Sequence, residues 1–188
     1  MGPVRRIVTG HDENGKSIFL SIGEAPQKHH RTEGAVQFHE IWNTSEMPVS
    51  IDATEEREPN DRLPLRIPPD ANGTILRVLD IHPGHLKHIK PREDGRHPGM
   101  HRTETVDYAI MIEGELTMLL DDSEVTMRPG DIVIQRGTDH GWENRSETVT
   151  ARIAFVLIDA KFAGSLGEQL EGADLMRTTI PQTSDTGR

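Results

Sequence analysis

The sequence predicts an all-β fold, a sandwich or a barrel, and three observations support this. Between residues 75 and 160, short apolar segments rich in β-branched residues follow one another at short intervals. Turn signals such as Pro-Gly, Arg-Gly and Asp-Asp-Ser separate these segments, as expected for hairpins. Helical spacing is confined to residues 164–177, so the alternation of strands and helices that indicates an α/β fold is missing.

The N-terminal third predicts two strands followed by an irregular arm. Segments 16–23 and 35–43 have the mixed character of strands, and the polar stretch QKHHRTEG separates them. Residues 47–73 contain five prolines among many charged residues, which excludes a regular helix or a central strand. We therefore expect residues 1–74 to pack on the outside of the main fold.

The central segment, residues 75–160, contains the strands of the predicted barrel. We place them at residues 75–84, 106–114, 115–121, 124–130, 131–137 and 149–160. Residues 161–188 follow as a short helix and a tail, because Leu166, Leu170 and Leu175 have helical spacing. At 188 residues, the chain has the length of one domain that buries its own core.

Composition excludes several classes of function. Acidic residues outnumber basic ones by 31 to 21, and the net charge of −10 repels a nucleic acid backbone. The chain has no cysteine, so metal chemistry would use histidine and carboxylate ligands. No apolar run reaches 18 residues, and the N-terminus lacks the apolar stretch of a signal peptide. We expect a soluble cytoplasmic protein that binds neither nucleic acid nor membrane.

Polar residues occupy every second position where the strand at 106–114 begins. His101, Thr103, Thr105 and Asp107 share one side of an extended chain, and the same side continues as Ala109 and Met111. A barrel that is packed at one end and open at the other accommodates both halves. The polar half then lines a cavity, and small-ligand sites prefer such barrel mouths.

A second polar position follows the strand at 131–137. After the Arg136-Gly137 turn, His140 is placed to meet His101 across the cavity. Two imidazoles and the Asp107 carboxylate make a 2-His-1-carboxylate set, which leaves positions open for substrate or dioxygen. Thr103, His97 or water would complete the shell around the metal ion.

These two segments resemble the motifs of the cupin superfamily. Gly95, His101, Asp107 and Gly114 fall on the positions of the first motif, in which the pattern is Gly, His-x-His, Glu and Gly. In the second motif, Gly130, Gly137, His140 and Asn144 match. The resemblance implies a double-stranded β-helix, or jelly-roll, barrel that forms a homodimer and binds iron, manganese, nickel or zinc.

The departures from the cupin pattern concern the metal ligands. Thr103 replaces the second histidine, Asp107 replaces a longer glutamate, and Gln135 stands where proline is usual. Each lost ligand weakens metal binding. The resemblance still implies a metal-dependent enzyme that acts on a small oxygenated, preferably anionic molecule, by dioxygenation, decarboxylation or isomerisation.

Two other functions remain open on the sequence alone. One is a non-catalytic cupin that binds a small ligand. The other is a metal-free isomerase or epimerase, in which Asp107 orients and charges His101 as a general base. Among further polar residues, Arg136 is a candidate for binding an acidic substrate and Tyr108 is expected to face away from the site. The histidines at 29, 30, 82, 85 and 88 are expected to be mostly solvated.

Overall fold

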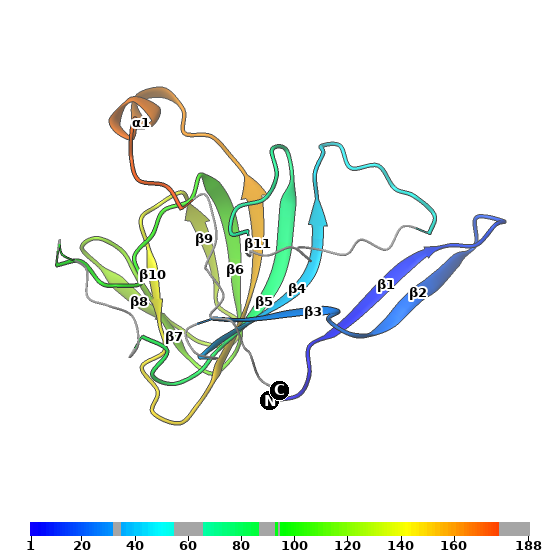
Figure 1. Cartoon of the computed structure of the whole chain (residues 1–188), viewed down its shortest axis with the longest axis horizontal. Helices are drawn as coiled ribbons and strands as arrows, with labels where there is room; N and C mark the ends of the chain where they lie inside the picture. The colour runs from blue at the N-terminus through cyan, green and yellow to red at the C-terminus, as the bar shows by residue number, and fades with distance from the viewer. Residues whose placement is uncertain (32–34, 55–65, 87–92, 94, 177–188) are drawn as a thin grey trace, which may run out of the picture.

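The computed structural model describes residues 1–31, 35–54, 66–86, 93 and 95–176, and in them strands dominate (Figure 1). The helix is α1 (Gly164–Gln169). The strands are β1 (Arg5–His11), β2 (Ser17–Glu24), β3 (Gln27–Arg31), β4 (Val36–Thr44), β5 (Thr74–Ile81), β6 (Thr105–Glu113), β7 (Leu116–Leu119), β8 (Glu124–Met127), β9 (Ile132–Arg136), β10 (Gly141–Glu143) and β11 (Ala151–Asp159). No helix in this described part of the chain has the length and apolar character needed to cross a membrane.

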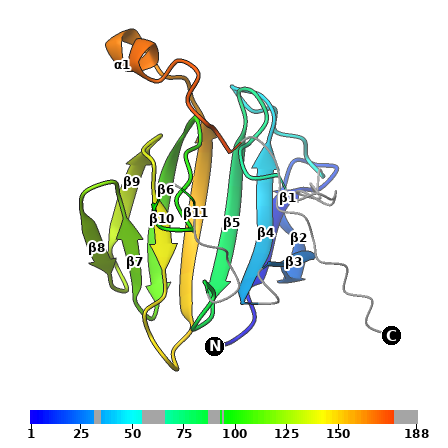
Figure 2. The same ribbon diagram turned by 60° about the vertical axis from the view of Figure 1, so that its left-hand side comes forward.

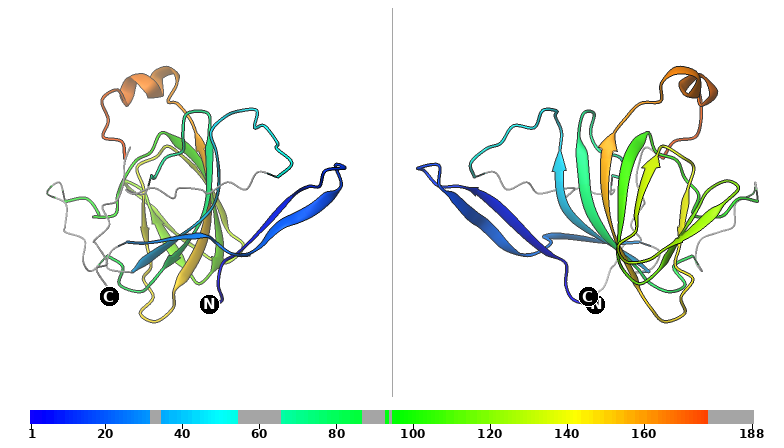
Figure 3. Two further views of the ribbon diagram at one scale, coloured as in Figure 1. Left: turned by 45° about the vertical axis from the view of Figure 1, so that its right-hand side comes forward. Right: turned by 180° about the vertical axis from the view of Figure 1, so that it is seen from behind.

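The strands form two facing sheets and a separate hairpin, and every pairing between neighbours is antiparallel. The large sheet has the order β3-β4-β5-β11-β6-β9, and the small sheet has the order β10-β7-β8 (Figure 2). The hairpin of β1 and β2 projects away from these sheets (Figure 3). This architecture confirms the predicted all-β jelly-roll barrel.

The core lies between the two sheets, where the strands turn alternate side chains inward. On β6, Ala109 and Met111 are buried, whereas Tyr108 and Ile112 are exposed. Residues from both sheets and from the loop before β5 complete the apolar cluster, among them Phe38, Ile67, Ile75, Leu116, Met127, Ile153 and Phe155. Burial of each such side chain contributes about 1.5–3 kcal/mol of transfer free energy.

Most predicted elements are present, with some differences in extent. The predicted strands at 16–23, 35–43 and from residue 75 to 160 correspond to β2, β4, β5, β6, β7, β8, β9 and β11. The sequence did not predict β1, β3 or β10. The helix predicted over 164–177 ends at Gln169 in the structure, and residues 177–188 lie outside the described part.

The N-terminal segment contributes to the barrel itself. β4 pairs with β5 from Val36↔Ile81 to Thr44↔Thr74, and β3 pairs with β4 along the sheet edge. These strands therefore extend the barrel wall, although residues 1–74 were expected to pack outside it. Of the predicted proline-rich arm, the described residues 47–54 and 66–73 contain neither strand nor helix, and residues 55–65 lie outside the described part.

Two motif glycines close tight turns after β6 and β9. Gly114 follows β6 with a φ of +75°, and a Cβ there would lie 2.8 Å from the carbonyl oxygen of Thr150. Gly137 follows β9 with a φ of +60°, and a Cβ there would lie 2.6 Å from the ring of Phe162. Glycine adopts this left-handed backbone without strain, so the turn after β9 can direct the chain toward His140.

Candidate functional site

The polar half of the β6 face points inward, as the sequence predicts. Thr103, Thr105 and Asp107 have exposed fractions of 2%, 2% and 5%. Their side chains lie on the same side as Ala109 and Met111, so one continuous strand face passes from polar to apolar. This arrangement confirms that a buried polar surface lies inside the barrel.

His101 and His140 lie directly next to each other. The two residues exchange backbone hydrogen bonds, from the His101 amide to the His140 carbonyl at 2.8 Å and from the His140 amide to the His101 carbonyl at 2.9 Å. Their ring centroids are 4.3 Å apart, with an angle of 50° between the planes. The prediction that these histidines meet is therefore confirmed, although they lie side by side on directly paired backbone and do not face each other across the cavity.

Backbone carbonyls fix the tautomer of both imidazoles. Nδ1 of His101 donates to the carbonyl oxygen of Gly99 at 2.9 Å, and Nδ1 of His140 donates to that of Thr138 at 3.0 Å. Because a carbonyl oxygen only accepts, each Nδ1 carries a hydrogen, and in a neutral ring the lone pair is then on Nε2. Burial, followed by the proximity of His101, lowers the pKa of His140 to about 3, so His140 is neutral at physiological pH.

Asp107 is a buried carboxyl group that lacks full hydrogen bonding. Its Oδ1 atom has no hydrogen-bond partner among the described residues. Burial raises the pKa of Asp107 to about 6, against the opposing effects of a hydrogen bond from Thr105 and the charge of Arg77. The pKa of this carboxyl group therefore lies close to neutral pH, where the group can both release and take up a proton.

The hydroxyl of Thr103 is bonded within the protein. Thr103 Oγ1 lies 2.7 Å from Thr105 Oγ1, and Thr105 in turn contacts the Asp107 carboxylate. The three side chains form a row that leads from the segment before β6 onto the inner face of that strand. Each of the two hydroxyl groups therefore has a hydrogen-bond partner within the protein.

The predicted metal ligands can be tested against the geometry that a metal ion requires. A neutral imidazole whose Nδ1 atom donates a hydrogen bond has the tautomer in which Nε2 ligates a metal. Among the described residues, however, no group of three or more histidine, aspartate or glutamate side chains lies close enough to hold an ion. The side chains of His101, Asp107 and His140 therefore do not assemble a three-ligand set in this structure, and the metal assignment, with Thr103 included, stays a prediction.

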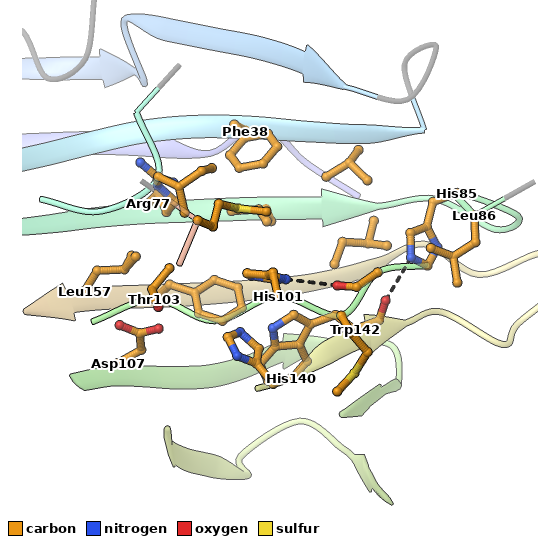
Figure 4. Close-up of a pocket in the computed structure, with 18 of the residues that line it drawn as sticks. Phe38, Arg77, His85, Leu86, His101, Thr103, Asp107, His140, Trp142 and Leu157 are labelled. Atoms are coloured by element: carbon orange, nitrogen blue, oxygen red, sulfur yellow. Dashed lines mark hydrogen bonds between the residues drawn. The ribbon is translucent and has the colours of Figure 1, made fainter. Parts of the chain in front are cut away.

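These side chains line a cavity of about 320 Å³ inside the barrel. Figure 4 shows His101 and His140 next to each other, Asp107 near Thr103, and His85 at the opposite end of the cavity. Most of the remaining wall is apolar and includes Phe38, Ile67, Leu79, Met100, Phe155 and Leu157. The cavity thus combines a polar end with an apolar body, as small-molecule sites do.

A buried ion pair forms part of the same wall. Arg77 is 3% exposed, and its Nε atom lies 3.2 Å from Oε1 of Glu40, which is fully buried. A second guanidinium nitrogen of Arg77 donates to the carbonyl oxygen of Arg66 at 2.8 Å. The charge of Arg77 is therefore balanced within the wall, and sequence reasoning missed this pair because the segment from Thr74 to Ile81 is otherwise an apolar strand.

The other residues that the sequence singled out lie partly at the cavity and partly outside it. Tyr108 is 40% exposed and faces away from the cavity, as expected. Trp142 forms part of the cavity wall. The side chain of Asn144 donates to the carbonyl oxygens of Ile81 and Val149, so it ties the chain after β10 to the end of β5 and to the segment before β11. Arg136 is exposed and does not line the cavity.

The surrounding histidines depart from expectation. His85 and His29 are 5% and 8% exposed, so the expectation of solvated histidines is wrong for both. His85 lines the cavity, while Nδ1 of His97 accepts a hydrogen bond from the Gly99 amide and His97 is not among the lining residues. His88 lies outside the described residues. Spacing alone could not find His85, because its partner Trp142 is 57 positions away.

Comparison with known proteins gives consistent matches. A family model described as the cupin domain matches residues 85–158. A cupin-domain-containing oxidoreductase of Aspergillus ruber is 35% identical over 178 residues, which cover 90% of this chain and 79% of that protein. Phomopsin biosynthesis cluster protein C' of Diaporthe leptostromiformis is 34% identical, with 83% and 78% covered. The solved Cnp3 cupin domain of Schizosaccharomyces pombe is 10% identical with a TM-score of 0.46, over 92% of this chain and 97% of that one.

Proposed function

The chain belongs to the cupin family, and we propose that it is an enzyme that acts on a small, oxygenated organic molecule inside the barrel. The observation that carries this proposal is the polar end of the cavity. A carboxyl group with a pKa of about 6 lies in the same cavity as two neighbouring imidazoles, and the rest of the wall is apolar. Titratable groups perturbed in this way, within a cavity, favour a reaction site.

Asp107 would transfer the proton. As a carboxylate, it takes a proton from a carbon next to a carbonyl group, so the C–H bond breaks and its electron pair forms an enolate. As the resulting acid, it returns the proton to the same or a neighbouring carbon, which gives exchange or isomerisation without another reactant. A pKa near the operating pH suits both directions of this transfer.

His140 would orient the substrate. Its neutral imidazole carries the lone pair on Nε2, so a substrate hydroxyl can donate a hydrogen bond to it. The low pKa of His140 keeps its ring in the accepting form. This places the oxygenated end of the substrate in the part of the cavity that also holds Asp107.

The cavity favours a neutral substrate. Among the described residues that line the cavity, one is an arginine, Arg77. Its charge is paired with that of Glu40. An anion would enter an apolar wall without a free cation, at a high cost in desolvation free energy. We therefore propose an uncharged molecule with an apolar body, in place of the anion that the sequence suggested.

The relatives give independent support for small-molecule chemistry. Two of the proteins that this chain resembles are named as a cupin-domain-containing oxidoreductase and as a biosynthesis cluster protein. We propose a similar role here, in the conversion of a biosynthetic intermediate. An enolate is an electron-rich species of the kind that oxidations consume, so the proposed proton transfer is compatible with such a role.

The test is a screen for proton exchange. Wild-type protein is incubated in deuterated water with apolar cyclic ketones and phenolic ketones, and mass spectrometry follows deuterium uptake with and without a chelator. The proposal predicts uptake that a chelator does not change and that Asp107→Asn abolishes. Loss of uptake on chelation would show that metal-free proton transfer is wrong. Tight binding without any turnover would favour the non-catalytic binding protein.

A metal-dependent enzyme is the second candidate, and the tautomers of His101 and His140 favour it. If an ion is bound, these two imidazoles would hold it, and it would supply Lewis-acid polarisation of a substrate oxygen. Elemental mass spectrometry on untagged protein, beside a His101→Ala/His140→Ala variant, tests this candidate. Near one equivalent of iron, manganese, nickel or zinc, absent from the variant, would establish it.

A further inference from the structure

We propose that residues 161–176 form a strap that closes the polar end of the cavity, that Met176 is its covering residue, and that the strap opens to admit the substrate. The inference rests on the proposed function in one respect, namely that a small molecule enters this cavity. It adds the route of entry and a residue of the site that the proton-transfer chemistry does not require.

The polar end of the cavity is nearly closed to solvent. Thr103, Asp107 and His140 line it, and each is almost completely buried. The neighbouring wall is a sheet in which β11 pairs along its length with both β5 and β6, so it does not part easily. A substrate that reaches these residues therefore needs an opening in a segment outside the sheets.

The strap leaves the barrel after β11, passes through α1 away from the barrel, and returns to it (Figures 1 and 2). Its first residues are fixed, because the amide of Phe162 donates to Oε1 of Glu104 at 3.0 Å and the Phe162 ring lies against Gly137. Beyond this point α1 buries none of its side chains. Its amides bond to carbonyl oxygens of the strap itself. The middle of the strap thus has little to hold it on the barrel.

Met176 brings the strap back beside the site. Its amide donates to the carbonyl oxygen of Arg102 at 2.7 Å, and Arg102 stands between His101 and Thr103, which both line the cavity. The Met176 side chain lines the same cavity and packs against the apolar core. A methionine side chain is apolar and flexible, so it can exclude water from the site and adapt to molecules of different shape.

The wall is held less firmly at Met176 than at two other irregular segments. Ile67 and Met100 also line the cavity from outside the strands, and they are 7% and 6% exposed, whereas Met176 is only partly buried. Release of Met176 breaks one backbone hydrogen bond and uncovers one apolar side chain. This costs much less free energy than separation of paired strands.

Thiol labelling tests whether the strap closes and opens. The chain has no cysteine, so Met176→Cys carries a single thiol, and Leu166→Cys places one on the exposed α1 as the matched control. Mass spectrometry follows the reaction with iodoacetamide. Met176→Cys is expected to react about tenfold more slowly than Leu166→Cys, because its thiol is available only when the strap is open. Low concentrations of urea should hardly change its rate, since opening exposes little surface.

Quenching of tryptophan fluorescence tests whether the strap guards the cavity. In a Trp42→Phe background, Trp142 is the remaining tryptophan, and it lines the cavity. Met176→Ala is expected to increase its quenching by acrylamide about twofold, because this small neutral quencher then enters more readily. Leu166→Ala lies on the same strap but does not line the cavity, and it is expected to leave the quenching unchanged.

Three results would overturn the inference. Equal labelling rates in Met176→Cys and Leu166→Cys would show that the strap does not close. A labelling rate for Met176→Cys that rises steeply with urea would show that the thiol is reached only by unfolding of the whole chain. Unchanged quenching of Trp142 in Met176→Ala would show that Met176 does not guard the cavity. None of these measurements uses a substrate, so deuterium uptake that depends on Asp107 supports or contradicts the proposed function separately.

Discussion

The two faces of β6 have opposite relations between polarity and burial. On the inner face, Thr105 and Asp107 are almost completely buried, and on the outer face Tyr108 and Ile112 are 40% and 45% exposed. A one-residue shift of register would exchange the two faces. Ala109 and Met111 pack in the core and thereby set the register of β6. Thr105 and Asp107 lie on the same face, so they are buried as well. The difference shows that position on the sheet, and not polarity, decides which side chains of β6 are buried.

The largest effect is expected when Met111 on the inner face of β6 and Ile112 on its outer face are each replaced by alanine. Met111→Ala is expected to lower the free energy of unfolding by about 3 kcal/mol, because it leaves a cavity at a residue that is 1% exposed. Ile112→Ala, one position away, is expected to change it by about 0.5 kcal/mol or less. Urea denaturation measures both, and equal losses would show that the faces are assigned wrongly.

Removal of the buried charge should stabilise the protein. The pKa of Asp107 is raised from 3.8 to about 6, so the folded state holds its proton more tightly than the unfolded state. Stability from this group is therefore lost as pH rises from about 4 to above 6, and at pH 7 the cost is on the order of 3 kcal/mol. Asp107→Asn is expected to recover much of this.

Urea denaturation of wild type and Asp107→Asn from pH 4 to pH 7.5 checks this prediction. The advantage of the variant should grow across that range. An advantage that is constant or shrinks with pH would contradict a raised pKa.

The threonine row on the inner face should tune the carboxyl group. Thr105→Val removes the hydrogen bond that favours the charged carboxylate, so it is expected to raise the pKa of Asp107 and to cost about 1 kcal/mol of stability. Thr126→Val breaks a similar hydroxyl pair with Thr117 on the small sheet and is the matched control. Carboxyl NMR titration should show a shift for Thr105→Val alone, and equal shifts would exclude a local effect.

The outer face should have the smallest effect on folding. Ile132 and Ile134 on β9 are 62% and 54% exposed and lie beside β6. Ile134→Lys is expected to change the stability of the chain by about 0.5 kcal/mol or less. Light scattering on the same variant examines the homodimer that the sequence predicts. A dimeric wild type and a monomeric variant would place the interface here, and a monomeric wild type would contradict the dimer.

Sequence reasoning succeeded where a local pattern determines the structure. The alternation around Asp107 predicted which side chains point inward, and the motif spacing predicted that His101 and His140 meet. It failed where distant partners decide the outcome. β3 is a polar segment that becomes a strand by pairing with β4. The helix after Ala163 ends early, in a segment where glycines lower helix propensity.

Site residues outside the motifs were missed for the same reason. Arg77 is held by Glu40 on the neighbouring strand, 37 positions away, and His85 is held by Trp142. Their own segments gave no signal of a role, since Arg77 lies within an apolar strand and His85 lies among several histidines. Pairwise contacts of this range become visible only when the barrel is assembled.

The most direct test of the account is the pKa of Asp107 itself. Protein labelled with ¹³C at aspartate carboxyl groups is titrated by NMR, and Asp107→Asn assigns the resonance. The proposed proton transfer requires a midpoint near 6, because Asp107 then exchanges its proton at physiological pH. A midpoint at or below 4 would mean that Asp107 is a permanently charged carboxylate, and it would contradict the proposed reaction centre.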